Sequence, residues 1–165
     1  MSPIAYLRGD ATLPQTAGHV IICHVCNDAG GWGKGFVMAV SKRWREPEAA
    51  YRSWFAERKH NDFGLGSVQL IQVEAEKWVA NMVAQVGTRP HNGKPPIRYD
   101  AVAACLAIVS AHAVRLDASV HMPRIGCGLA GGEWAEIEPL IQAQLLPHGL
   151  QVFVYDFAPD EAPRD

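Results

Sequence analysis

Cysteine, excess charge and long apolar runs are all scarce in this sequence. Only four cysteines occur in 165 residues, at positions 23, 26, 105 and 127. Zinc would need two more ligands at a spacing comparable to that of Cys23 and Cys26, and no second Cys or His pair supplies them. Because side chains alternate along a strand, Cys23 and Cys26 are also expected on opposite faces. We therefore expect reduced thiols, a cytoplasmic protein and no metal or other cofactor.

Charge and hydropathy exclude further classes of protein. Lys and Arg number 15 and Asp and Glu number 17, which gives a net charge of −2. Such a balance indicates no general binding of nucleic acid or of an anionic membrane. No apolar run has membrane length, and no signal-peptide pattern occurs. We expect a soluble protein without a membrane partner, and we favour a monomer.

The length and the apolar pattern predict one α/β or α+β domain over residues 1–157, followed by a polar tail over 158–165. Of the composition, 48% is hydrophobic and 19% charged, which is ordinary for a globular protein. Val20–Cys23 is apolar on both faces, as in a central strand covered by helices on both sides. The patterns predict strands at 4–7, 19–26, 67–73, 78–86, 119–122 and 150–157, and helices at 36–45, 47–60, 99–116 and 134–145.

Two glycine-rich stretches each follow an apolar strand and open a helical pattern. The first is CNDAGGWGKG at 26–35, and the second lies in SVHMPRIGCGLAGGEW at 119–134. Glycine permits positive φ and close approach of the backbone to a ligand, and we expect this at Gly126, Gly128, Gly131 and Gly132. The amides of a following helix N-terminus favour an anion. The two stretches could hold the two phosphates of a dinucleotide, or they could be ordinary connecting loops.

Two polar residues at strand ends are further candidates. Asp10 follows the first strand, where α/β proteins place ligand contacts, although it could also cap a turn through its side chain. His24 lies near the end of the central strand and is either a structural residue or a general acid or base.

A region rich in glycine and proline, residues 87–97, carries Arg89, His91 and Lys94. It is either a mobile lid or simply a long loop. Asn81 and Gln85 precede it on one strand and share a face, so one end of the sheet is expected to be polar.

Together these stretches resemble the macrodomain family. The resemblance rests on Gly9-Asp10, on Asn27 followed by Gly31-Trp32-Gly33-Lys34-Gly35, and on Met122-Pro123-Arg124-Ile125-Gly126-Cys127-Gly128-Leu129 with Trp134. Within the family, the sequence is most similar to the branch of the terminal ADP-ribose protein glycohydrolase and the yeast ADP-ribose 1''-phosphate phosphatase. The match runs in order through nearly the whole chain.

The resemblance implies a three-layer α/β/α fold with a mixed central sheet of about six strands and a metal-independent site for ADP-ribose. Asp10 would accept a hydrogen bond from adenine, Asn27 would contact the distal ribose, and Tyr155 or Phe157 would stack on the base. The implied ligand-binding residues are Asp10, Gly31, Trp32, Gly33, Lys34, Gly35, Ile125, Gly126, Cys127, Gly128, Leu129, Ala130 and Tyr155. The implied partner is ADP-ribose or an ADP-ribosylated target. The net charge disfavours nucleic-acid binding, which stays open only for an ADP-ribosylated DNA or RNA end.

Two positions depart from the glycohydrolase pattern. Gln85 stands where those enzymes have a lysine nucleophile, and Ala130 stands where they have an aspartate, so their covalent mechanism is not expected. His24 matches a histidine of the yeast phosphatase. We therefore expect a hydrolase that removes a terminal phosphate from an ADP-ribose derivative or cleaves an ADP-ribosyl bond, with His24, Asn27 and Asp28 as catalytic residues. The alternative is a non-catalytic reader of ADP-ribose.

Overall fold

Six strands form one mixed sheet in the order β1-β6-β5-β2-β4-β3. The structure is a computed structural model that describes residues 3–157, so the tail expected at 158–165 lies outside the described residues. All neighbouring strands are parallel except β3 and β4, which are antiparallel. The strands are β1 (Ala5–Arg8), β2 (Val20–Asn27), β3 (Val68–Glu74), β4 (Lys77–Gln85), β5 (Ser119–Met122) and β6 (Val152–Asp156). The expected mixed sheet of six strands is confirmed.

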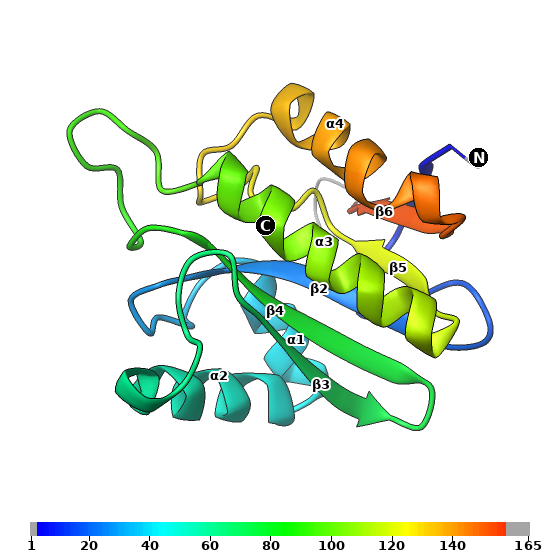
Figure 1. Cartoon of the computed structure of the whole chain (residues 1–165), viewed down its shortest axis with the longest axis horizontal. Helices are drawn as coiled ribbons and strands as arrows, with labels where there is room; N and C mark the ends of the chain where they lie inside the picture. Colours follow the sequence, from blue (N-terminus) through cyan, green and yellow to red (C-terminus); the bar gives the residue numbers. More distant parts are fainter. Residues whose placement is uncertain (1–2, 158–165) are drawn as a thin grey trace.

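Helices cover both faces of this sheet, with α1 and α2 on one side and α3 and α4 on the other (Figure 1). Each side has its own apolar cluster. The helices are α1 (Phe36–Arg43), α2 (Glu46–Ala56), α3 (Tyr99–Leu116) and α4 (Trp134–Gln144), with short 3₁₀ turns η1 (Arg58–His60) and η2 (Leu146–His148). The three-layer α/β/α arrangement is therefore as expected.

The central strand β2 is buried along its whole length. Cys23 belongs to the cluster beneath α3 and α4, and Cys26 to the cluster beneath α1 and α2, so their predicted placement on opposite faces is confirmed. All four cysteines are free. Burial raises the pKa of the Cys23 thiol, and it raises that of Cys105 to about 12, which keeps both thiols protonated at neutral pH. Within residues 3–157 no group of three or more His, Cys, Asp or Glu side chains could hold a metal ion.

Helix α3 bears on the expectation that no apolar run of the sequence has membrane length. Its 18 residues have a mean hydropathy of 1.4, so by length and composition alone it could cross a membrane. Seven of its residues are buried, and its apolar side chains pack against the sheet and α4. Because the core helix of a globular domain passes the same test, α3 is weak evidence for a membrane span.

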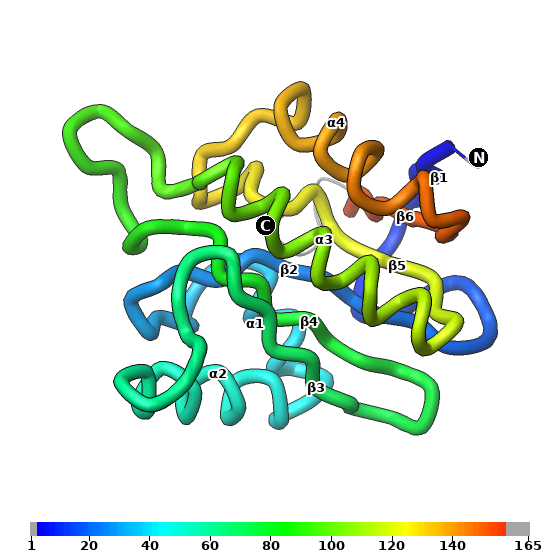
Figure 2. The backbone as a smooth tube through the Cα atoms, viewed as in Figure 1, coloured from blue at the N-terminus to red at the C-terminus, as the bar shows by residue number. Residues whose placement is uncertain are grey.

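Residues 87–97 form a narrow β-hairpin, which we call the finger, at the upper left of Figure 1 and Figure 2. Its base is the antiparallel bridge between Gln85 and Ile97, and its tip is a second bridge between His91 and Lys94. Asn92 and Gly93 lie between His91 and Lys94 and have φ of 53° and 73°. An Asn-Gly pair with both φ positive is the preferred type I′ hairpin turn. The region is thus an ordered hairpin.

Candidate functional site

A cavity of about 520 Å³ lies at the C-terminal ends of β2 and β4. Three segments build its wall: the end of β2 with the first glycine loop and α1, the base of the finger, and the end of the second glycine loop. The lining residues are Val25, Cys26, Asn27, Gly31, Trp32, Gly33, Lys34, Val37, Gln85, Thr88, Arg89, Pro90, Leu129 and Ala130. This volume is within the range of about 300–1,000 Å³ that is typical of small-molecule sites.

Asn27 gives the first glycine loop its shape. Its Oδ1 accepts hydrogen bonds from the N–H groups of Ala29 (2.9 Å) and Gly31 (3.0 Å), and its Nδ2 donates to the carbonyl of Gly31 (2.9 Å). The Tyr51 hydroxyl donates to the Asn27 carbonyl (2.7 Å) and accepts from the N–H of Gly30 (3.1 Å). Desolvation raises the pKa of Tyr51, so this donor stays protonated. A loop held by five short hydrogen bonds offers a pre-organised surface to a ligand.

Helix α1 starts at this loop and leaves its N-terminus without a side-chain cap. Gly35 occupies the N-cap position with φ 83°, a conformation that favours glycine. First-turn amides without such a cap favour an anionic ligand. Lys34 and Arg89 are the cations of the cavity wall, and within residues 3–157 neither takes part in an ion pair. The lining contains no carboxylate and no imidazole, so the described part of the cavity suits a polyanion.

The second glycine loop only partly matches the predicted backbone. Gly126 and Gly131 have φ of 72° and 75°, but Gly128 and Gly132 are not among the residues with positive φ, so that expectation is wrong for these two. A Cβ at Gly126 would lie 2.7 Å from the Ile97 side chain. At Gly132 a Cβ would lie 2.5 Å from the carbonyl oxygen of Gly126, so this glycine is required for close packing.

Only the end of the second loop reaches the cavity. Leu129 and Ala130 line it, with 58% of Leu129 exposed. Ile125 is fully buried in the core, and Cys127 is half-buried and packs against the same cluster. Ile125 and Cys127, which were predicted to contact the ligand, therefore do not line the cavity, whereas Leu129 and Ala130 do.

Asp10 caps a turn and lies outside the cavity. Its Oδ1 accepts from the N–H (2.8 Å) and the hydroxyl (2.7 Å) of Thr12, and its Oδ2 lies 3.7 Å from a guanidinium nitrogen of Arg43. Asp10 was expected either to contact a ligand or to cap a turn, and in the structure it caps a turn.

Tyr155 is a correction to the expected site. Its ring is 1% exposed, and its hydroxyl accepts from the N–H of Gln15 (3.0 Å) and is hydrogen-bonded to Nδ1 of His121 (2.8 Å). Phe157, the other candidate for stacking on adenine, is 5% exposed. Since both rings are packed in the protein, neither presents an open face to a ligand.

His24 is a second correction, because it lies in the core and not in the cavity wall. Its side chain has no exposed surface, and its Nε2–H donates to Oδ1 of Asn81 (2.6 Å). The ring packs edge-on against Trp32, with centroids 5.3 Å apart, and against Phe36 at 5.9 Å. Desolvation lowers the pKa of His24 to about 4, so the ring is neutral at physiological pH. The geometry of His24 therefore matches a structural residue and not a general acid or base.

Asp28 holds the finger and does not line the cavity, which corrects its expected catalytic role. Its Oδ1 accepts from the N–H of Gly87 (2.8 Å). Gln85 faces the cavity and donates from Nε2 to the carbonyl of Gly87 (3.0 Å). The two side chains together fix the base of the finger.

Sequence reasoning missed two structural contributions to the site. Tyr51 is absent from the predicted site residues, although its hydroxyl supports the first loop. Arg124 forms a bidentate pair with Asp156 (2.8 and 3.0 Å), which fastens the start of the second loop to the end of β6. No local sequence signal marks either contact, because the partners are 24 and 32 positions apart.

No family model matches the chain. A solved structure of a macrodomain protein from Streptomyces coelicolor is 55% identical, with a TM-score of 0.85 over 94% of this chain and 99% of that one. Among curated proteins, Chromodomain-helicase-DNA-binding protein 1-like of Mus musculus is 32% identical over 96% of this chain. This chain spans only 18% of that protein's length and 15% of the Danio rerio protein of the same name.

Two more distant similarities are to proteins whose descriptions mention ADP-ribose. ADP-ribose 1''-phosphate phosphatase of Lodderomyces elongisporus is 22% identical over 84% of this chain and 90% of that protein. Thermosipho africanus DarTG, solved in complex with ADP-ribose, is 16% identical, with a TM-score of 0.63 over 86% of this chain and 38% of that one. The latter similarity shows a common fold.

Proposed function

This chain belongs to the macrodomain family, and we propose that the cavity between its two glycine loops binds ADP-ribose and its derivatives. The observation that carries the proposal is the wall of the cavity: an organised glycine loop, a helix N-terminus and two cations without ion-pair partners, with no lining carboxylate. A diphosphate has the charge and the oxygen acceptors for such a wall. The DarTG structure with ADP-ribose, which shares the fold, supports the same ligand.

Within this cavity, the first glycine loop is the diphosphate-binding element that we propose. Its amides and those of the first turn of α1 would donate to phosphate oxygens, and Lys34 and Arg89 would neutralise the charge. Asn27 donates one of its two Nδ2 hydrogens to Gly31, which leaves the other for a ribose hydroxyl or a water.

We further propose that the site hydrolyses a bound derivative, by removal of a terminal phosphate or cleavage of an ADP-ribosyl bond. Similarity to a protein named ADP-ribose 1''-phosphate phosphatase supports this activity. Because no carboxylate or imidazole lines the described cavity, we propose that a water oriented by Asn27 attacks the terminal phosphorus or the ribosyl carbon. The bond from that atom to the leaving-group oxygen breaks, the water's proton passes to the departing oxygen, and Lys34 and Arg89 stabilise the negative charge. The same lack of a base favours the alternative, a reader that binds without turnover.

Calorimetry with ADP-ribose in EDTA tests binding, and no heat at millimolar ligand would refute it. Incubation with ADP-ribose 1''-phosphate and with ADP-ribosylated protein, followed by assays for phosphate and ADP-ribose, then tests hydrolysis. Binding without any release identifies a reader. We also propose a cytoplasmic location, which the four free cysteines support.

A further inference from the structure

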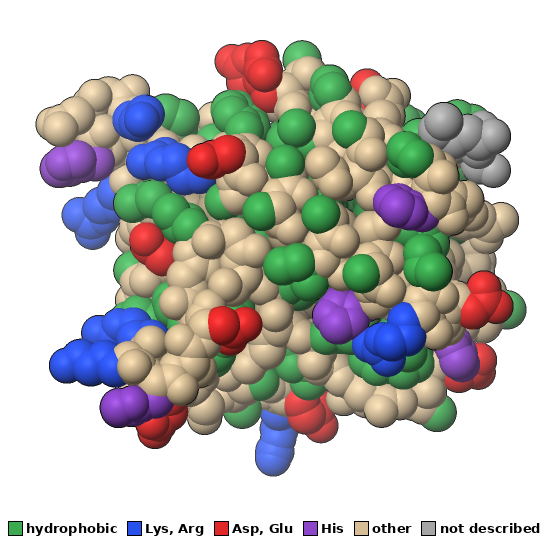
Figure 3. Space-filling view, viewed as in Figure 1, with side chains coloured by type: hydrophobic (Ala, Val, Ile, Leu, Met, Phe, Trp, Pro, Cys, Tyr) green, Lys and Arg blue, Asp and Glu red, His purple; other side chains and the backbone are tan. Residues whose placement is uncertain are grey.

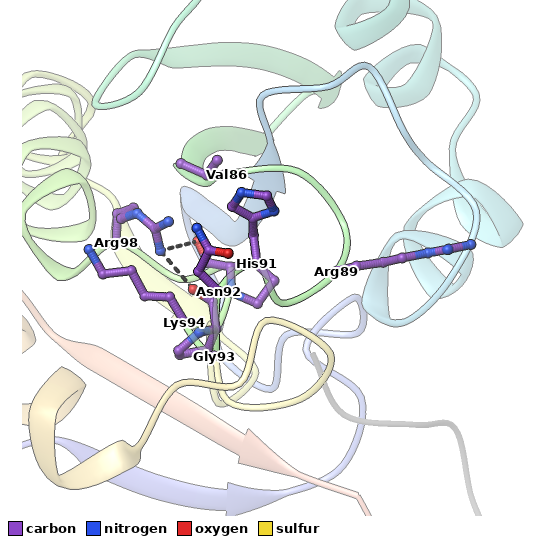
Figure 4. A pocket seen from close by; sticks show the side chains of 9 residues that line it. Val86, Arg89, His91, Asn92, Gly93, Lys94 and Arg98 are labelled. Carbon is purple, nitrogen blue, oxygen red and sulfur yellow. Dashed lines mark hydrogen bonds between the residues drawn. The ribbon is translucent and has the colours of Figure 1, made fainter.

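A second hollow, of about 390 Å³, lies against the finger. In Figure 4 the side chains of His91, Asn92, Lys94 and Arg98 gather on one side of the hairpin, and Arg89 extends away from them. The hollow is separate from the ADP-ribose cavity described above but is adjacent to it, because Arg89 contributes to the lining of both.

The finger is locally cationic in a chain whose net charge is −2. From residue 87 to residue 99 the sequence has three Arg or Lys residues and one His, and no Asp or Glu. Figure 3 shows the corresponding blue and purple side chains at the upper left, over the finger. In the described part of the chain Lys94 has no ion-pair partner. Its charge is therefore available to an external anion.

The hollow is also built on a fixed base. Arg98 donates from Nη1 to the carbonyls of Pro95 (2.7 Å) and Ile97 (2.8 Å), which holds its guanidinium beneath the hairpin. The N–H of Val86 donates to the carbonyl of Pro96 (2.9 Å), across the base of the finger. With Asp28 bound to Gly87, these contacts hold the cationic hairpin at the mouth of the ADP-ribose cavity.

We propose that the finger binds an acidic segment of a protein target, next to the residue that carries the ADP-ribosyl group. The inference rests on the proposed function, because it requires ADP-ribose in the neighbouring cavity. Because Arg89 lines both the cavity and the hollow, a segment that leaves the cavity on this side would lie next to the hollow, where a carboxylate would pair with Lys94.

The chemistry of the hollow favours a peptide over a nucleic acid. No Phe, Tyr or Trp lines it, whereas single-stranded nucleic acids are held by bases stacked on aromatic rings along a basic groove. The charge is also limited to one short hairpin, and a chain with a net charge of −2 repels a long polyanion. The cations of this small hollow are Arg89, Lys94 and Arg98, of which Arg98 is held by backbone carbonyls, so the hollow suits one or two acidic side chains.

The test is a titration of the whole chain with two ADP-ribosylated peptides that differ only in Asp or Asn beside the modified residue, with free ADP-ribose as the reference. We expect the Asp peptide to bind about two- to fivefold more tightly, the effect of one exposed ion pair, and the preference to fall at 1 M salt. Lys94→Gln should abolish the preference and leave the affinity for free ADP-ribose unchanged. Lys59→Gln, an exposed lysine in η1 outside both cavities, is the matched control and should preserve it.

The possible results separate the finger from the cavity. If the wild-type chain binds ADP-ribose but binds the two peptides equally, or if Lys94→Gln retains the preference, the finger proposal is overturned and the proposed function is not. A chain that does not bind free ADP-ribose overturns both. Tighter, Lys94-dependent binding of an ADP-ribosylated oligonucleotide would replace the peptide with a nucleic acid.

Discussion

Replacing His24 by alanine distinguishes a catalyst from a core residue. The mutation leaves Oδ1 of Asn81 buried without its donor, which costs about 1–3 kcal/mol. It also removes a ring that packs against Trp32 and Phe36, and truncations of this size cost about 2–4 kcal/mol more. We therefore expect His24→Ala to lower the free energy of unfolding by about 3–7 kcal/mol. Because His24 does not line the cavity, the ADP-ribose affinity and any turnover per folded molecule should change by less than about threefold.

Urea unfolding at pH 7.5 measures the loss of stability, and calorimetry and product release are measured at a temperature where the variant is folded. His148→Ala, at an exposed histidine in η2, is the control and should change none of these quantities. If His24→Ala does not fold, His24→Gln keeps a donor and can replace it. A loss of turnover of about 10²- to 10⁴-fold, with an unchanged free energy of unfolding, would restore His24 as the general acid or base and refute the structural reasoning.

The other predictions concern pH, the glycines and the first loop. Burial lowers the pKa of His121 from 6.5 to about 4. Between these pH values the unfolded chain binds a proton at His121 that the native chain does not, so the free energy of unfolding should fall as the pH drops from about 6.5 to 4. His121→Gln should flatten this dependence in urea titrations. An unchanged slope would contradict this. Gly126→Ala, at positive φ and close to Ile97, should cost about 1–3 kcal/mol in thermal unfolding, whereas Gly33→Ala, with open space around it, should cost less than about 0.5 kcal/mol; equal costs would be evidence against the packing argument. Asn27→Ala should weaken ADP-ribose binding about tenfold by calorimetry, because the first loop loses three hydrogen bonds, and an unchanged affinity would mean that the loop does not contact the ligand.

Local sequence patterns determined the elements of the fold. Hydrophobic periodicity predicted α3 with its observed bounds, because a helix of five turns repeats its apolar face often enough to be recognised. The two-sided apolar run of β2 placed it at the centre of the sheet, and the glycine stretches located the two loops near the cavity. The Asn-Gly pair at the tip of the finger was also a local hairpin signal, but it lay in a region interpreted as a lid or a long loop.

The tertiary structure decided which of the polar candidates reach the cavity. His24 and Tyr155 stand near the ends of strands, as ligand-binding residues do, yet helix α1 and the segment around Gln15 bury them. Asp28 belongs to the first glycine stretch in sequence, but its carboxylate is bound to Gly87, just beyond the end of the neighbouring strand β4. Exposure and hydrogen-bond partners depend on contacts between residues far apart in the chain. The sequence by itself therefore determined the framework and the position of the two loops, and only the packing of distant segments decided which side chains line the site.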